Sequence, residues 1–77
     1  MSPRLPRVTA KQIIKVLDSR GFSLVRQSGS HQIYRNPGGR RVTVPYHAGQ
    51  TIHPKVLKSI LADADMAVDD FIRALDE

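Results

Sequence analysis

The chain has 77 residues, with 12 Lys and Arg against seven Asp and Glu, a formal net charge of +5. This length allows a single domain, and the absence of cysteine excludes disulfides, cysteine nucleophiles and Cys-based zinc or iron–sulfur sites. The sum of +5 hides an asymmetry, because residues 1–62 hold 11 basic residues and one acid, Asp18, whereas residues 63–77 hold six acids and Arg73. A strongly basic body points first to a nucleic-acid partner.

Neither a membrane span nor a secretory leader is expected. The chain has no window of 18 apolar residues, and Met1 to Arg7 lacks an apolar core. Small secreted domains are usually rich in disulfides, so the lack of cysteine favours the cytoplasm.

A helix is predicted over about residues 10–20, after a flexible lead over 1–8 that contains Pro3 and Pro6. Thr9 and Gln12 have the spacing of a capping box, and Gly21 supplies a left-handed stop. The folded domain is therefore expected over residues 9–77.

Three short strands are predicted next, over about 22–27, 31–35 and 40–44. The turns between them contain Ser28-Gly29-Ser30 and Asn36-Pro37-Gly38-Gly39. Strands joined by tight turns form an antiparallel meander.

Two helices follow. Pro54 suits the first position of a helix, and the apolar stripe of this helix is expected to contain Val56, Leu57, Ile60 and Leu61. A short helix is predicted over 68–75, where Asp69 and Arg73 can form an i,i+4 pair. The predicted fold class is α+β in the order α-β-β-β-α-α, with a three-stranded antiparallel sheet covered on one face by helices.

The acid–base groups of the basic body are its three histidines, the usual side chains for proton transfer near neutral pH. RNA can be cleaved without a metal when a base removes the 2′-hydroxyl proton and cations stabilise the phosphate charge. His31 is the best placed, because it follows Gly29 at the start of a strand and the hydroxyls of Ser28 and Ser30 could bind phosphate. The alternative is an ordinary half-buried strand residue that shares a face with Ile33 and Arg35.

The cations Lys11, Arg26 and Arg41 are expected to surround the Gly29–His31 turn. His47 either assists RNA binding or caps its loop, and His53, before Pro54, is expected to cap a helix. The three histidines lack metal-ligand spacing, so no metal or cofactor is predicted. Tyr34 and Tyr46 could stack on bases, whereas Phe22 and Phe71 are expected in the core.

Several segments together resemble the HicA family of toxins over about residues 9–75. They are Gly21-Phe22, Arg26-Gln27-Ser28-Gly29-Ser30-His31-Gln32-Ile33-Tyr34-Arg35, Arg41-Val42-Thr43-Val44-Pro45-Tyr46-His47, Leu57-Lys58-Ser59-Ile60-Leu61 and Asp69-Asp70-Phe71-Ile72. The Gly-Ser-His element within this frame carries the most specificity.

The resemblance implies a fold like that of double-stranded-RNA-binding domains and the activity of an mRNA interferase, a metal-independent endoribonuclease that blocks translation. It implies His31 as the catalytic histidine and a HicB-like antitoxin as the partner that masks it. The RNA-binding residues expected beside His31 are Lys11, Arg26, Ser28, Gly29, Ser30, Arg41, Tyr46 and His47.

The sequence departs from the usual family pattern at three places. Ser28 stands where a Lys often precedes Gly-Ser-His, Lys55 replaces a Gly at the start of the second helix, and Asp65 replaces a Gly after it. Two other hypotheses stay open: a non-catalytic RNA-binding module on the same fold, and an interaction domain for an acidic protein.

Overall fold

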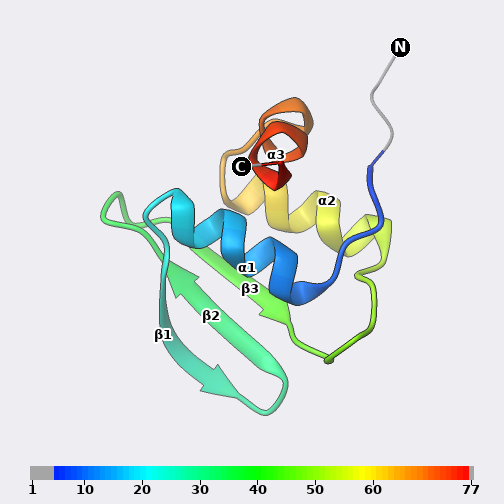
Figure 1. The fold of residues 1–77 in the computed structure, drawn as a ribbon. Helices are drawn as coiled ribbons and strands as arrows, with labels where there is room; N and C mark the ends of the chain where they lie inside the picture. Colours follow the sequence, from blue (N-terminus) through cyan, green and yellow to red (C-terminus); the bar gives the residue numbers. More distant parts are fainter. Residues whose placement is uncertain (1–4, 77) are drawn as a thin grey trace.

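The computed structural model describes residues 5–76. Six elements follow one another along the chain (Figure 1). Their bounds are Ala10–Ser19 for α1, Ser23–Ser28 for β1, His31–Arg35 for β2, Arg41–Pro45 for β3, Pro54–Asp63 for α2 and Val68–Leu75 for α3. This order confirms the predicted α+β class, and the bounds of β2 and α3 agree with those expected from the sequence.

The three strands form an antiparallel sheet in the order β1-β2-β3. Residues that face each other on neighbouring strands lie on the same side of the sheet. Tyr34, Val42 and Val44 are buried on one side, against which α1 and α2 pack through β3. The other side, here called the open face, carries His31, Ile33 and Arg35 on β2 with their partners Ser28 and Arg26 on β1 and Pro45, Thr43 and Arg41 on β3.

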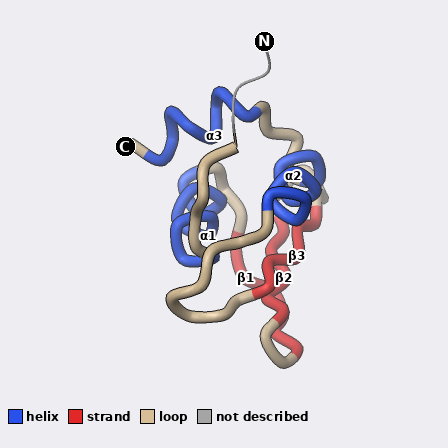
Figure 2. Tube along the Cα trace, turned by 90° about the vertical axis from the view of Figure 1, so that its right-hand side faces the viewer, coloured by secondary structure: helices blue, strands red, loops and turns tan. Residues whose placement is uncertain are grey.

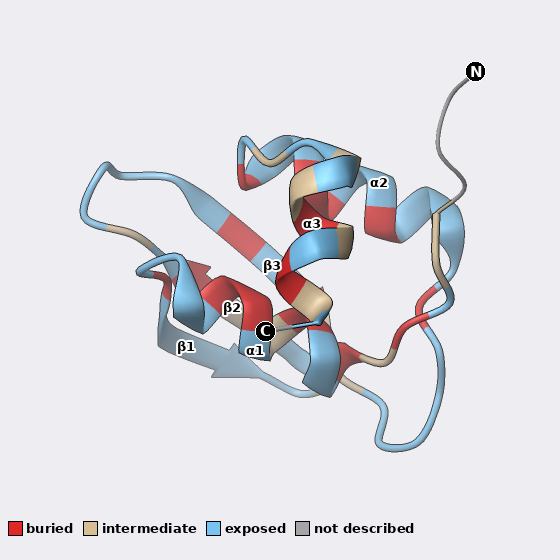
Figure 3. Ribbon diagram, turned by 45° about the horizontal axis from the view of Figure 1, so that its top comes forward, coloured by how far each residue is buried: buried red, intermediate tan, exposed pale blue. Residues whose placement is uncertain are grey.

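Strand β1 is an exposed edge. The helices pack on β3, above which α2 lies in Figure 2. All six residues of β1 are exposed, including Leu24 and Val25 at 49% and 55%, and Figure 3 colours the strand pale blue. The register with β2 shifts between Leu24 and Arg26. Such a bulge twists an edge strand and discourages pairing with another chain.

The hydrophobic core draws on every element except β1. Phe22 and Phe71 are 3% and 1% exposed, which confirms their predicted core positions. The α2 stripe is narrower than expected: Leu57, Ile60 and Leu61 are buried, but Val56 is 38% exposed. Neighbouring residues of a helix point about 100° apart around its axis. Val56, next to Leu57, therefore lies at the border of the buried stripe.

The predicted helix starts are confirmed. The Thr9 amide donates to Gln12 Oε1 at 2.8 Å, and the Gln12 amide donates to Thr9 Oγ1 at 3.3 Å, as a capping box requires. His53 Nδ1 accepts from the Lys55 amide at 3.1 Å.

Val8 is buried, and its carbonyl accepts from the Ile52 amide at 2.7 Å, so the packed part of the chain begins before Thr9.

Helix α3 packs on α1, and both views place it far from the strands (Figures 1 and 2). Asp65 in the turn before it has φ of 55°, a left-handed conformation that Asp tolerates better than most non-glycine residues. Arg40 reaches this turn by donating to the Asp63 carbonyl at 3.1 Å. Arg73 pairs with Asp70 at i,i+3, whereas the sequence predicted a pair with Asp69.

Within residues 5–76 no helix is long and apolar enough to cross a membrane.

Candidate functional site

His31 is exposed at the first position of β2. It lies opposite Ser28 on β1 and Pro45 on β3, at the end of the central strand and with a strand on each side. The register places His31 on the open face with Ile33 and Arg35, as the sequence pattern predicted. An exposed imidazole on an open sheet face is accessible to a large substrate.

The turn before His31 is held in place from two sides. Gly29 has φ of 57°, a left-handed conformation that glycine adopts without a steric penalty. Gln27 Nε2 donates to the Gly29 carbonyl at 3.3 Å, and the Tyr46 amide donates to the Ser30 carbonyl at 2.7 Å. The hydroxyls of the flanking serines therefore have a defined place beside His31: Ser28 is exposed and Ser30 is half-buried.

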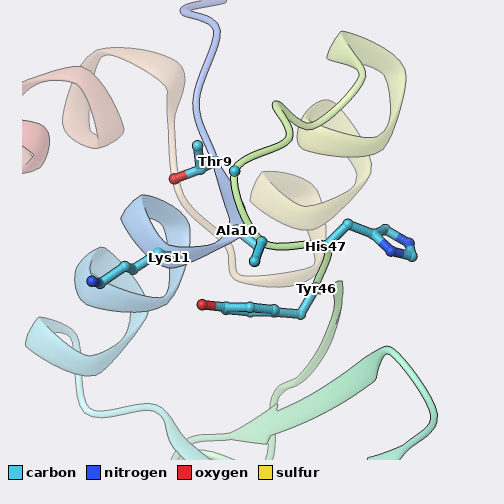
Figure 4. Close-up of a pocket in the computed structure, with 7 residues that line it drawn as sticks. Thr9, Ala10, Lys11, Tyr46 and His47 are labelled. Carbon is cyan, nitrogen blue, oxygen red and sulfur yellow. The ribbon is translucent and has the colours of Figure 1, made fainter.

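Three of the predicted RNA-binding residues meet at a pocket of about 330 Å³ next to this turn. Lys11 from α1 lines it with Tyr46 and His47, which follow β3. The Tyr46 hydroxyl points toward the Lys11 side of the pocket, whereas the His47 ring turns to the opposite side (Figure 4). Because Tyr46 also binds Ser30 through its amide, the pocket adjoins the turn that carries His31.

The predicted arginines lie farther from this turn than expected. Arg26 faces Ile33, two residues along β2 from His31, and Arg41 faces Arg35, four residues along. Four residues of strand span about 13 Å. Arg41 therefore lies at the opposite end of the sheet, and Lys11 lies on α1, so the three cations do not surround the turn together.

Arg35 was overlooked as a candidate ligand-binding residue. Together with Val25 and Ile33, the three arginines Arg26, Arg35 and Arg41 line a hollow of about 280 Å³ on the open face. The alternation of side chains along the strand predicts that Arg35 lies on the same face as His31. It does not predict that Arg35 lies opposite Arg41, because this pairing depends on the length of the turn at Asn36–Arg40.

Tyr34 is not available to stack on a base. Its side chain is buried, and its hydroxyl donates to Gln32 Oε1 at 2.7 Å. Burial raises the pKa of the Tyr34 phenol, and the nearby charges of Asp18 and Tyr46 raise it further. Tyr46 is thus the tyrosine of the candidate site.

All charged residues of the sheet and its turns are basic. No acidic residue occurs between Asp18 and Asp63 in the sequence, and the acidic helix α3 lies on α1, away from the strands (Figure 1). Within the part of the chain that the structure describes, no three His, Asp or Glu side chains come together as metal ligands would.

Comparison with known proteins supports one family. The family model described as the HicA toxin of bacterial toxin–antitoxin systems matches residues 10–66, well over half of the chain. The match contains His31, its turn and the whole sheet, and it ends before α3. Curated proteins provide no match. The chain therefore belongs to the HicA family of toxins from bacterial toxin–antitoxin systems.

Proposed function

We propose that this toxin is a metal-independent endoribonuclease that cleaves mRNA and so blocks translation, with His31 as its general acid or base. The observation that carries the proposal is the position of His31, exposed on an open sheet face that holds several arginines and no acid. A polyanion would be attracted to this face, and histidine is the side chain suited to proton transfer near neutral pH.

The chemistry needs two proton transfers. The 2′-hydroxyl of the substrate loses its proton, the 2′-oxygen forms a bond to the adjacent phosphorus, and the bond from phosphorus to the 5′-oxygen breaks while that oxygen gains a proton. His31 carries out one of these transfers, and its exposure leaves water free to take part in the other. The hydroxyls of Ser28 and Ser30 and the cations Lys11 and Arg26 bind and orient the phosphates.

The partner that controls this activity is a HicB-like antitoxin that covers the open face and His31. Membership of a toxin–antitoxin family implies an antitoxin partner, and a toxin that cleaves mRNA would act in the cytoplasm. Because the surface to be covered is basic, the antitoxin should present carboxylates to it.

The test compares wild type with His31→Ala, both in a growing bacterium and as purified protein with RNA in excess chelator. We expect wild type to stop growth and cleave RNA, and His31→Ala to lose at least about 100-fold in cleavage rate, the usual contribution of a general acid or base. Because the side chain is exposed, the variant should keep its circular dichroism spectrum and thermal stability.

His53→Ala is the matched control, since it removes a histidine whose contact is the α2 cap. It should lose about 1 kcal/mol of stability and still cleave RNA when assayed well below its unfolding temperature. If wild-type protein binds RNA without cleaving it, a non-catalytic RNA-binding module would replace the proposal.

A further inference from the structure

The end of the open face opposite His31 carries a cluster of like charges. Arg35 and Arg41 face each other directly on β2 and β3, and Arg26 lines the same hollow from β1; these three are called the arginine cluster. Within residues 5–76 the ion pairs are Arg40 with Asp65 and Arg73 with Asp70, so no carboxylate neutralises the arginine cluster. Like charges directly opposite in a sheet are destabilising, which indicates that the cluster serves an anionic ligand rather than the fold.

Two aliphatic residues line the hollow beside the arginines. Val25 and Ile33 line it together with the arginine cluster, and Val25 is 55% exposed at the bulge of β1. Aliphatic side chains beside guanidinium groups match a nucleotide, because the base can lie against the aliphatic side chains or stack on a guanidinium plane. The guanidinium forks bind the phosphate in bidentate fashion.

The hollow and His31 lie on one line along β2. On the open face, Ile33 lies two residues along β2 from His31 and faces Arg26, and Arg35 lies four residues along. Measured along β2, the arginine cluster therefore begins about 7 Å from His31 and ends about 13 Å from it. An extended single strand that places one phosphate at His31 therefore lays its next nucleotides over the hollow. A protein strand added to the edge of β1 is disfavoured by the bulge there.

We propose that the arginine cluster forms a nucleotide subsite for single-stranded RNA, separate from the position of the cleaved phosphate and reached along β2. The subsite rests on the proposed function in that the same RNA strand passes His31. It predicts that RNA long enough to span both positions binds more tightly than a dinucleotide, which can occupy only one.

The test measures binding by fluorescence anisotropy, with a 2′-O-methyl hexanucleotide and a 2′-O-methyl dinucleotide, neither of which can be cleaved. For Arg35→Gln/Arg41→Gln we expect affinity for the hexanucleotide to fall at least about tenfold. The advantage of the hexanucleotide over the dinucleotide should shrink toward one. The slope of log K against log salt should become shallower by about 1.4, because two phosphate contacts are lost from a single strand.

The matched control is Lys55→Gln/Lys58→Gln, which removes two exposed positive charges from α2. It should bind the hexanucleotide within about twofold of wild type if the cluster, and not general charge, holds the RNA. Unchanged affinity and salt slope in the arginine double variant would overturn the subsite. Equal wild-type affinity for a poly-glutamate peptide of the same charge would also overturn it, in favour of an acidic protein.

The subsite and the proposed function can fail separately. Wild-type cleavage that is lost in His31→Ala, together with unchanged hexanucleotide binding in the arginine double variant, leaves the enzyme and removes the subsite. Absence of wild-type cleavage, together with binding that depends on the arginine cluster, removes the enzyme and supports the cluster as an RNA-binding site.

Discussion

At Gly29 the backbone of the candidate site has φ of 57°, and a Cβ built there meets no described atom within 4 Å. Substitution therefore costs backbone strain without a steric clash. We predict that Gly29→Ala lowers the free energy of unfolding by about 1–2 kcal/mol and that Gly29→Asn costs less, since asparagine tolerates the left-handed region. Urea unfolding measures both.

Gly38→Ala is the control for this prediction. A Cβ at Gly38 would come within 3.5 Å of Asn36 Oδ1, an ordinary contact, and its backbone is not in the left-handed region. It should change stability less than Gly29→Ala does. Equal costs for Ala and Asn at Gly29 would show that conformational strain is not the cause.

The raised pKa of Tyr34 predicts that the free energy of unfolding depends on pH in the alkaline range. Its folded-state pKa lies above the ordinary value of 10.0, chiefly through burial and then through Asp18 and Tyr46. The folded state therefore holds the phenol proton more tightly than the unfolded state does. The resulting contribution to the free energy of unfolding is complete below pH 10 and is lost as the pH rises through the folded pKa. The hydroxyl also donates to Gln32. Tyr34→Phe should thus be less stable than wild type by about 0.5–1.5 kcal/mol at pH 7.

The measurement is urea unfolding of both proteins at pH 8 and pH 11. The difference between wild type and Tyr34→Phe should narrow at pH 11, and because lysines titrate in both proteins their effect cancels in the comparison. A difference that stays constant across this range would contradict the raised pKa.

At the scale of the elements, the pairing of β2 with β3 brings two arginines together. Their mutual repulsion lowers the stability of the fold, whereas their charges favour the binding of RNA. Since Arg35 and Arg41 face each other, Arg41→Gln should raise the free energy of unfolding by about 0.2–1 kcal/mol. The gain should shrink in high salt, which screens the repulsion. Chemical unfolding at low and high salt checks both statements.

A double-mutant cycle provides the control. Once Arg41 is neutral, neutralising Arg35 relieves no further repulsion between the two, so the double variant should gain less than the sum of the single gains. Additive gains would mean that the two side chains do not interact. A stabilising substitution that weakens RNA binding is the expected signature of residues kept for function.

The helices and strands also show which features could be predicted from the sequence. The capping box at Thr9 and the placement of His31 at the start of β2 could be predicted because both depend on residues within a few positions of each other. The bulge at Val25 and the pairing of Arg35 with Arg41 could not. Both depend on how one strand aligns with its neighbour, and a slip of one residue would move every side chain to the other face.

For the whole molecule, charge is separated by layer. The acid-free sheet carries His31 and the arginine cluster, while α3 carries Asp69 and Asp70 on the far side of α1. The arrangement of the elements thus separates the acidic helix from the sheet that carries His31 (Figure 1). Acids in the first turn of α3 also complement its helix dipole, and this matters because Ala67 gives α3 no side-chain cap.

Helix α3 lies outside the segment that the HicA family model matches, yet it contributes one of the largest fully buried side chains of the domain, Phe71. A chain of this size has a total stability of roughly 4–12 kcal/mol, and truncation of a buried Phe to Ala costs about 3–5 kcal/mol. Phe71→Ala should therefore remove much of the stability of the sheet and of the candidate site, although α3 packs mainly on α1.

Thermal unfolding followed by circular dichroism tests this dependence, with Asp69→Asn as the control on the same helix. Asp69 is exposed and Arg73 pairs with Asp70 instead, so the control should stay within about 0.5 kcal/mol of wild type. If Phe71→Ala unfolded at the wild-type temperature, α3 would be an appendage of a domain complete at residue 66. If the sheet melts together with α3, the basic face depends on the acidic helix for its stability, although the two share no charged contact among residues 5–76.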